Sequence, residues 1–477
     1  MTGIASFGAY VPATRLPLAR IGGGAGADAA GPERAVASFD EDAITLGVAA
    51  AVDCLRGFDR AAVDAVSFAS TTSPYREKLG ASLVAKALDL RRDVATADFA
   101  GSLRAGTTAL RAALDAVAAG SARCVLVVTA DCRPAAPRSA LERSFGDGAA
   151  AFLVSDTRPV LTCIGTSVVA DEILDVWRAE GDAFVRTWEE RFVLEHGHRS
   201  VLAEAVRALF AKTGTGPADF ARAALYAPDA ASHAALARAL GIDAERQQPA
   251  LFGRLGNAGA AFAPLLLVGA LESARPEDRI LVGSYGDGAE ASAWRVTEEI
   301  EKLAPRRGLA GHLARRRALR DYTAFLRMRH LEASEHDVRT APGISATVHF
   351  RERDEDIALQ AGRCRRCGVE QFPAPRVCSG CYGRDTMDSV RLSDRPGRLL
   401  SYTLDHFFPT PEPPLAVGVV RVEGGARVYL QLCDVAEAEL RCDLPVELVF
   451  RRIHEVGGKP NYFWKATPLR DGTEGPR

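Results

Sequence analysis

Two C-x-x-C pairs constrain this chain more tightly than any other segment. They lie in the run CRRCGVEQFPAPRVCSGC and contribute Cys364, Cys367, Cys378 and Cys381, with ten residues between the pairs. This spacing can place four thiolates at the corners of a tetrahedron, about 2.3 Å from one zinc ion. Two disulfides or a redox dithiol are the alternatives. Four thiolates leave no open coordination position, so the pattern predicts a structural zinc module late in the chain.

Length and charge set broad limits on the rest of the protein. A chain of 477 residues is too long for a single hydrophobic core and should form several domains. The formal net charge of −2 argues against a general nucleic-acid or membrane-surface binder. The start of the chain has no leader pattern, and no apolar run reaches the length of a membrane span. The sequence therefore predicts a cytoplasmic protein.

The first part of the chain alternates between strand and helix patterns. Apolar runs predict strands, and apolar residues at helical spacing predict helices. The expected strands cover 3–11, 65–69, 94–99, 124–130, 149–154 and 161–169, and the expected helices cover 41–55, 79–88 and 104–119. The run CVLVVTA at 124–130 is continuously apolar, as in sheets that are covered on both faces.

The second part repeats this alternation. Helices are expected at 200–212, 231–240 and 264–271, and strands at 223–226 and 279–284. Strands that alternate with helices twice over predict an α/β protein built from two similar halves, with largely parallel sheets.

The remaining chain has a different pattern. Residues 301–345 are charged and helical, then rich in small residues, and are expected to form a connector. After the cysteine pairs, four short strands at 398–405, 416–422, 426–434 and 446–452 fit a small OB-type barrel. The expected domains are 1–160 and 161–300 as the two α/β halves, 301–345 as the connector, 346–390 as the zinc ribbon and 391–477 as the barrel.

Four turn motifs indicate where chemistry takes place. The stretch ADFAGSLRAGTTAL (97–110) reads as a strand, a tight turn and a helix start, an elbow that presents backbone N–H groups at a helix N-terminus. The others are SFGDGAAAF (144–152), RLGNAGAAF (254–262) and ILVGSYGDGAEASAW (280–294). Each is weak alone, because glycine-rich turns are mostly only turns. Their order and spacing are more specific.

Together these motifs resemble the thiolase superfamily, and most closely the archaeal form of its 3-hydroxy-3-methylglutaryl-CoA synthase branch. The resemblance covers residues 1 to about 330 and includes GAYVP, AGT after the elbow, DVWRAEG (175–181), GNAG and SYGDGAEASA. The rest of the chain resembles the zinc-ribbon and OB-fold proteins that accompany thiolase-like subunits in acyl-CoA metabolism. The resemblance implies a layered αβαβα thiolase fold followed by a zinc ribbon and an all-β OB barrel.

The residues at the active-site positions differ from those of the synthase branch. Where the family has a nucleophilic cysteine in a pattern like FACKAGT, this chain has FAGSLRAGT, which puts Leu103 at that position and Ser102 beside it. Tyr226 in LYAPD stands where the family has its catalytic histidine, and Thr71 in STTSPY stands where the family has its acidic residue. Only the family's asparagine is retained, as Asn257.

These departures change the expected chemistry. Leu103 has no nucleophilic atom and cannot be acylated. Ser102 has no obvious histidine partner in the sequence to act as its base, so the usual cysteine acyl-enzyme is not expected. We expect aldol or retro-aldol chemistry on a 3-hydroxyacyl-CoA. In this hypothesis Tyr226 acts as acid or base if its surroundings lower its pKa, and Asn257 and the elbow amides hold a thioester enolate. Thr71, Leu103 and Tyr285 are expected to line the substrate pocket.

Two other functions are left open by the sequence. One is an acyltransferase or condensing enzyme that uses Ser102 as its nucleophile, and the other is a non-catalytic subunit that binds acyl-CoA or acts as a scaffold. The resemblance implies a coenzyme A thioester as substrate, a homodimer, and room for a further subunit of acyl-CoA metabolism. No nucleic acid and no membrane are expected as partners. An enzyme is favoured over a scaffold.

Overall fold

A computed structural model describes residues 2–22, 31–331, 345–456 and 458–470 of the chain. These residues divide into two compact units. The first unit comprises 1–37, 42–85 and 90–322, and the second comprises 38–41, 86–89 and 323–477. Within the described residues, no helix combines the length and the apolar character needed to cross a membrane.

The first half of the first unit contains every element that the sequence predicts there. Its strands are β1 (Gly3–Tyr10), β4 (Ala65–Ala69), β5 (Ala95–Phe99), β6 (Cys124–Cys132) and β7 (Asp147–Ser155), and its main helices are α1 (Ala43–Cys54), α2 (Gly80–Ala87) and α3 (Ala105–Ala118). Asp42 caps α1, because its side chain accepts the N–H groups of Ile44 and Thr45. Boundaries differ from the prediction by one or two residues.

The second half repeats the same order. It contains β8 (Leu161–Ala170), α6 (Ser200–Thr213), β11 (Arg222–Leu225), α7 (Ala230–Ala239), α8 (Phe262–Leu271), β12 (Arg279–Tyr285) and β13 (Gly288–Val296). The predicted elements are again confirmed, and β13 is additional. Gln247 forms a parallel bridge to Ala223, at the place that β5 occupies beside β4 in the first half. The two halves therefore share one topology.

The prediction of largely parallel sheets is wrong. One nine-stranded sheet has the order β11-β12-β13-β8-β1-β7-β6-β4-β5, and only the pairs β4–β5, β4–β6 and β11–β12 are parallel. The pairs β6–β7 and β12–β13 are antiparallel. The connection between β12 and β13 is the tight turn at Gly286 and Asp287. A connection this short can only reverse the chain, because a parallel crossover needs a dozen or more residues.

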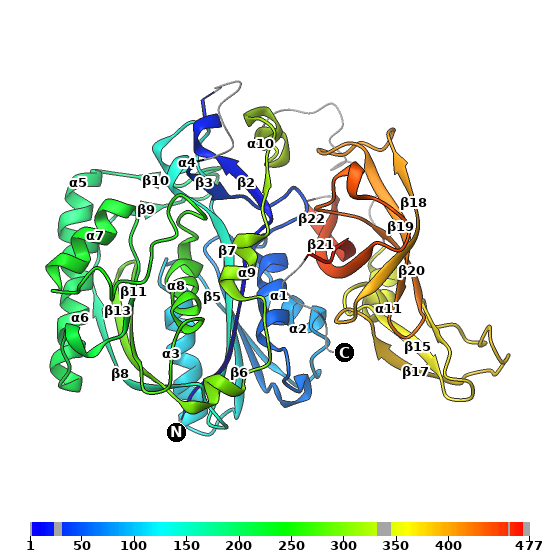
Figure 1. The fold of residues 1–477 in the computed structure, drawn as a ribbon, viewed down its shortest axis with the longest axis horizontal. Helices are drawn as coiled ribbons and strands as arrows, with labels where there is room; N and C mark the ends of the chain where they lie inside the picture. Colours follow the sequence, from blue (N-terminus) through cyan, green and yellow to red (C-terminus); the bar gives the residue numbers. More distant parts are fainter. Residues whose placement is uncertain (1, 23–30, 332–344, 457, 471–477) are drawn as a thin grey trace. The chain divides into compact units, whose positions relative to one another are not determined.

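Helices α3 and α8 lie in the centre of the layered first unit, between strands of its two halves (Figure 1). They hold equivalent positions, and each begins just after one of the turns that the sequence singles out. Gly106 in α3 permits a close approach, since a Cβ there would lie 2.6 Å from the carbonyl oxygen of Ala260. The elbow before α3 and Asn257 before α8 are therefore brought to the same region of the unit.

Shorter elements complete the first unit. They are β2 (Thr14–Pro17), η1 (Leu18–Arg20), β3 (Glu33–Ala35), η2 (Arg60–Ala62), α4 (Ala140–Ser144), β9 (Val176–Trp177), β10 (Arg186–Thr187), α5 (Glu190–Phe192), the π-helix η3 (Val193–Arg199), η4 (Pro217–Asp219), η5 (Gly259–Ala261), η6 (Glu298–Lys302), α9 (Gly308–Ala314) and β14 (Arg317–Ala318). Helix α10 (Tyr322–Met328) begins at the last residue of the first unit and otherwise belongs to the second. Helices α9 and α10 lie in the predicted connector, and η6 overlaps its start; residues 332–344 of the connector are outside the described residues.

After α10, the second unit contains a helix and a small ribbon. Helix α11 (Ala346–Asp356) occupies the first part of the range expected to form the zinc ribbon. A three-stranded sheet follows in the order β16-β15-β17, formed by β15 (Gln360–Cys364), β16 (Glu370–Gln371) and β17 (Met387–Arg391). The cysteine pairs lie in and between these strands.

The barrel follows the ribbon. Strands β18 (Gly397–Asp405), β19 (Leu415–Val422), β20 (Arg427–Gln431), β21 (Pro445–Val456) and β22 (Lys459–Pro468) form one antiparallel sheet in the order β20-β19-β18-β21-β22, with η8 (Glu437–Glu439) before β21. Leu432, just after β20, bridges Ala466 in β22, so the two edges of the sheet meet. The four predicted strands and the barrel are confirmed, and β22 is a fifth strand that the sequence prediction missed.

Candidate functional site

A cavity of about 280 Å³ lies in the first unit at the elbow before α3. Its lining includes Ser102 and Leu103 from the elbow, Gly286 from the turn after β12, and Thr71 from the loop after β4. The segment 172–178, which contains most of the DVWRAEG motif, forms another part of its wall. The structure therefore brings three of the turns and motifs that the sequence singled out to one cavity.

The elbow does not present an activated nucleophile to this cavity. Leu103 lines the cavity at the place expected for the family's cysteine. The Ser102 hydroxyl donates a hydrogen bond of 2.9 Å to the carbonyl oxygen of Gly286 and accepts one of 3.3 Å from the Arg104 N–H. The first contact ties the elbow to the turn after β12 and the second lies within the elbow, so the Ser102 hydroxyl has structural partners instead of a base.

Gly286 is the position where a small change should disturb this elbow most. Its φ is +154°, and a Cβ there would lie 2.8 Å from Ser102 Oγ and 2.9 Å from the Leu103 nitrogen. We expect Gly286→Ala to lower kcat about 100-fold for the expected reaction on a 3-hydroxyacyl-CoA. The added methyl group would displace the elbow, and displacements of about 1 Å in an active site have effects of that size. Gly214→Ala is the matched control, since Gly214 has a φ of +65° but open space around it. A similar kcat loss in both variants would contradict this interpretation.

Arg133 carries a buried positive charge at the cavity wall. It follows β6 directly and is only 3% exposed. Its guanidinium carbon lies 4.0 Å from the centre of the Phe145 ring, an attractive cation–π contact. Burial lowers the pKa of Arg133, and the nearby Tyr226 and Asp131 oppose this shift. Its Nε is itself buried and has no hydrogen-bond partner among the described residues.

Asp175 provides a carboxyl group in the same cavity. Burial raises the pKa of Asp175 to about 6, although Arg133 and Tyr285 favour the ionised form. A carboxyl with this pKa is ionised at neutral pH and can exchange a proton near it, which suits a general base. Sequence reasoning missed both Arg133 and Asp175. The only available signal was the DVWRAEG motif, which begins at Asp175 but served there only to support the family resemblance.

Tyr226 and Asn257 lie next to each other, as their proposed cooperation requires. The Asn257 Nδ2 group donates to the Tyr226 hydroxyl at 3.0 Å and to the carbonyl oxygen of Ala227 at 3.2 Å. Its Oδ1 accepts the Gly259 N–H at 2.9 Å. The side-chain amide of Asn257 is therefore fully used within the protein, and it positions Tyr226 instead of offering a free donor to an enolate.

The expected lowering of the Tyr226 pKa is not found. Burial raises the pKa of Tyr226 to about 12, against the opposing effects of Arg133 and Asn257. Tyr226 is 3% exposed and is not among the residues that line the 280 Å³ cavity. Its hydroxyl stays protonated near neutral pH, so Tyr226 is suited to donate a hydrogen bond and is a poor base.

Tyr285 belongs to an aromatic cluster behind the cavity. His198 contacts it edge-on with ring centres 5.5 Å apart, and His198 Nε2 donates a 2.9 Å hydrogen bond to the Tyr226 carbonyl oxygen. The Tyr285 hydroxyl has no hydrogen-bond partner of good geometry among the described residues, although Asp175 is near enough to affect its ionisation. Burial lowers the pKa of His198 to about 4, so its imidazole is neutral. This aromatic cluster therefore has a structural role behind the cavity and does not provide an acid–base pair.

Thr71 lines the cavity, but its hydroxyl is also in use. It donates to Asp131 at 2.9 Å, and the Thr71 N–H donates to the same carboxylate at 2.7 Å. Asp131 further accepts the Ala260 N–H at 2.7 Å, which links the loop after β4 to the start of η5. Asp131 is fully buried, and sequence reasoning did not single it out. Its network fixes the wall that Thr71 forms.

A second and larger cavity of about 550 Å³ lies beside η3 and α7. His198, which packs against Tyr226 and Tyr285, forms part of its lining. Three arginines also line it: Arg191, Arg199 and Arg238. Arg199 forms an ion pair of 2.9 Å with Glu195, so part of this positive charge is balanced. The cavity offers guanidinium groups of the kind that bind phosphate.

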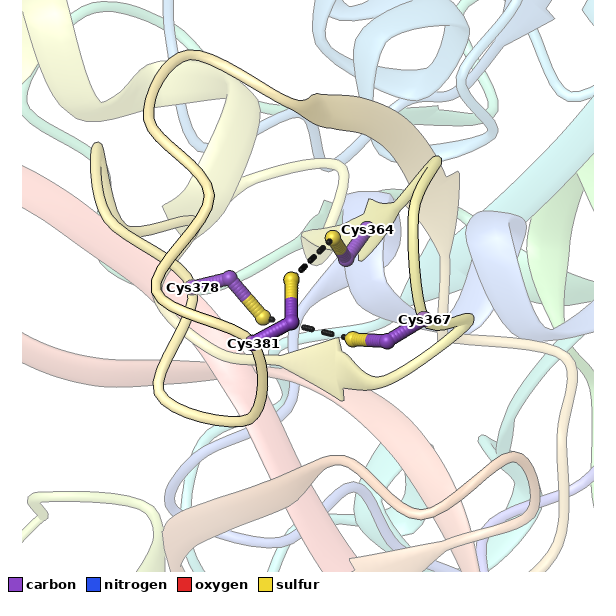
Figure 2. A group of neighbouring side chains, drawn as sticks. All are labelled: Cys364, Cys367, Cys378 and Cys381. Carbon is purple, nitrogen blue, oxygen red and sulfur yellow. Dashed lines mark hydrogen bonds between the residues drawn. The ribbon is translucent and has the colours of Figure 1, made fainter.

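The four cysteines of the ribbon point toward one common centre (Figure 2). Their sulfur atoms all lie within 4.8 Å of one another. Cys364 and Cys381 are 3.6 Å apart, and Cys367 and Cys378 are 3.5 Å apart. Thiolates around a zinc ion at about 2.3 Å would be about 3.8 Å apart, whereas a disulfide bond measures about 2.05 Å. The residues present fit a tetrahedral metal site and do not fit two disulfides.

The two cysteine pairs also share one backbone pattern. The N–H of Cys364 donates to the Val369 carbonyl oxygen, and that of Cys378 donates to the Gly383 carbonyl oxygen. Four residues after each of these cysteines the backbone turns to positive φ, at Gly368 and Tyr382. The Thr386 hydroxyl and backbone N–H groups lower the pKa of Cys364 to about 6. These donors favour the thiolate, which is the form that binds zinc.

Comparisons with known proteins match both parts of the chain. Residues 389–451 match a family described as the C-terminal OB-fold domain of ChsH2. Hydroxymethylglutaryl-CoA synthase of Pyrococcus horikoshii is 33% identical over 341 residues, which cover 69% of this chain and 95% of that protein. The enzyme of the same name from Aeropyrum pernix is 33% identical over 339 residues, which cover 69% and 94%. A solved structure of MvaS in complex with 3-hydroxy-3-methylglutaryl coenzyme A has a TM-score of 0.58 at 25% identity and covers 72% of this chain and 94% of its own.

Proposed function

Because this chain belongs to the hydroxymethylglutaryl-CoA synthase family, whose members are acyl-CoA condensing enzymes of the thiolase fold, we propose that its elbow cavity carries out aldol-type chemistry on a 3-hydroxyacyl-CoA. The reaction would run without a cysteine acyl-enzyme. A single observation carries this proposal: the elbow offers Leu103 and a Ser102 whose hydroxyl is bound to Gly286, while Asp175 and Arg133 face the same cavity.

The proposed cleavage needs only groups that are present at the cavity. The Asp175 carboxylate takes the proton of the 3-hydroxyl group, and the bond between C2 and C3 breaks. Its electron pair moves into the thioester as an enolate, and C3 leaves as an aldehyde or ketone. The protonated Asp175 then returns the proton to C2. No oxidant, reductant or second substrate is required, and the reverse sequence forms the bond.

Charge stabilisation in this scheme comes from Arg133 and the elbow. An enolate oxygen carries a developing negative charge, and preorganised donors in a water-poor site stabilise such charge strongly. Arg133 brings a positive charge to the cavity wall, and the Leu103 N–H makes no hydrogen bond to any described residue. We assign both to the enolate oxygen. Tyr226 stays protonated beside Arg133 and, held by Asn257, helps to keep the guanidinium in place.

The second cavity supports coenzyme A as the carrier of the acyl group. Its arginines, Arg191, Arg199 and Arg238, suit the phosphates at the far end of coenzyme A. Solved relatives include a hydroxymethylglutaryl-CoA synthase complexed with CoA. We therefore propose that the thioester reaches the elbow cavity while the nucleotide end remains near these arginines.

Incubation of the full chain with 3-hydroxyacyl-CoA substrates tests the proposal. We expect release of a carbonyl compound together with a shorter acyl-CoA, and no mass increase of the protein. An acyl adduct on Ser102 in the intact-protein mass spectrum would instead establish the acyltransferase alternative. Tight CoA binding without any turnover would establish the non-catalytic subunit.

We also propose that Cys364, Cys367, Cys378 and Cys381 hold one zinc ion, which is structural because the four thiolates leave no open coordination position for a substrate. The ion would supply a crosslink between the two cysteine pairs and no chemistry in the reaction. The homodimer, the further subunit and the cytoplasmic location stay predictions from the sequence.

A further inference from the structure

Three arginines form a row across one face of the barrel in the second unit. In the strand register Arg398 of β18 is opposite Arg421 of β19, and Arg421 is opposite Arg427 of β20. Side chains of directly opposed residues lie on the same face of a sheet. All three arginines are exposed. The residues directly before and after each of them in the sequence point to the opposite, inner face of the sheet and are buried. We call these three residues the arginine row.

The arginine row is not neutralised by the part of the chain that the structure describes. None of the three guanidinium groups forms an ion pair with a described residue. Within the row, Arg398 donates a hydrogen bond of 3.1 Å to the carbonyl oxygen of Asp443. Like charges that are directly opposed in a sheet destabilise it. A row that lowers stability and has no internal counter-charge points to an anionic partner.

The neighbouring residues suit a protein partner. The next cross-strand row on the same face contains Ser401, Val419 and Tyr429, and Tyr429 is 67% exposed. Arginine and tyrosine are the residue types that most often dominate binding energy at protein interfaces. A tyrosine next to three arginines therefore provides an apolar contact beside the charges.

The spacing of the row favours a helix that carries carboxylates. Adjacent strands are about 4.8 Å apart, so three arginines span about 10 Å across the sheet. Acidic residues at positions i, i+4 and i+7 of an α-helix span about 10.5 Å along one face. Phosphates on one strand of a nucleic-acid duplex follow each other every 3.4 Å along the axis, which matches the row less well.

We propose that the arginine row is a docking surface for an acidic helix of a partner protein. Each arginine of the row would bind one carboxylate of the helix, and Tyr429 would pack against its apolar side. The surface lies in the second unit and involves none of the residues assigned to the reaction. If the docking proposal fails, the proposed chemistry at the elbow cavity is therefore unaffected.

Fluorescence anisotropy with the full chain tests this surface. The probe is a labelled helical peptide with glutamate at i, i+4 and i+7, compared with the same peptide carrying glutamine there. We expect only the glutamate peptide to bind, and binding to weaken as salt is raised. Arg421→Glu should weaken it at least about tenfold, which corresponds to the loss of one good charge pair. Arg441→Glu makes the same charge change in the same unit outside the row and should leave binding unchanged.

Three outcomes would overturn the proposal. One is equal binding of both peptides, and another is equal weakening by Arg421→Glu and Arg441→Glu, which would indicate a general charge effect. The third is tighter binding of a single-stranded RNA oligonucleotide than of the glutamate peptide. Far-ultraviolet circular dichroism of each variant verifies that the barrel is folded.

Discussion

Replacing Asp175 with asparagine is expected to lower kcat on a 3-hydroxyacyl-CoA by about 10²- to 10⁴-fold, the usual contribution of a positioned general base. Asparagine has the same shape but cannot accept the proton of the 3-hydroxyl group. The variant should fold normally, because the change removes a charge that burial already disfavours. Steady-state kinetics with the full chain give the measurement. Asp171→Asn, an exposed carboxylate earlier in the same loop, is the control and should retain activity.

The pH profile separates Asp175 from Tyr226 as the base. Burial raises the pKa of Asp175 to about 6, and only the ionised carboxylate can accept a proton. In the wild type, kcat/KM should therefore fall about tenfold per pH unit below this pKa and level off above it. Asp175→Asn should abolish this acidic limb of the pH profile, in which kcat/KM falls below about pH 6. If the variant keeps both the limb and most of its activity, Asp175 is not the base.

The fold was predictable where local pattern determines structure. Continuous apolar runs such as 124–130 became buried strands, and the resemblance to the hydroxymethylglutaryl-CoA synthase branch is confirmed by relatives from two archaea. Strand direction was not predictable from these runs alone. The apolar runs look alike in parallel and antiparallel sheets, and connection length fixes the direction only where the connection is too short for a crossover, as between β12 and β13.

Strand β22 was missed for a different reason. Its sequence KPNYFWKATP carries Lys465 in the middle, which argues against a buried strand. Lys465 is nevertheless only 2% exposed, because its Nζ pairs with Asp40 at 2.8 Å. The partner lies more than 400 residues earlier in the chain, so no local pattern can reveal that this charge is satisfied.

The candidate site was predictable only in part. The family resemblance assigned Tyr226 and Asn257 to one site, and the structure joins them by a hydrogen bond that the sequence did not predict. Arg133 and Asp175 lie in irregular segments after strands, where residue pattern carries little information. Their importance arises from burial, which shifts the pKa of both groups and exists only in the folded chain.

Loss of zinc should have the largest effect on the second unit. Structural zinc contributes about 10 to 16 kcal/mol of apparent binding free energy in small zinc modules, and this energy is available to folding. The ribbon has only three short strands besides its cysteines, so it has little core of its own. We expect Cys378→Ser to abolish zinc binding, measured by elemental analysis, and to remove amide-exchange protection from 360–391. Cys378 is chosen because it is fully buried in the cluster.

Cys442→Ser is the matched control, because Cys442 is an exposed free thiol of the same unit outside the cluster. This variant should keep its zinc and its protection. A chelator added to the wild type should reproduce the effect of Cys378→Ser, whereas a reductant alone should not, since the cysteine sulfurs are too far apart for disulfide bonds. Loss of protection on reduction without release of zinc would show that disulfides hold the ribbon. Retention of the ordered ribbon in metal-free protein would show that packing alone is sufficient.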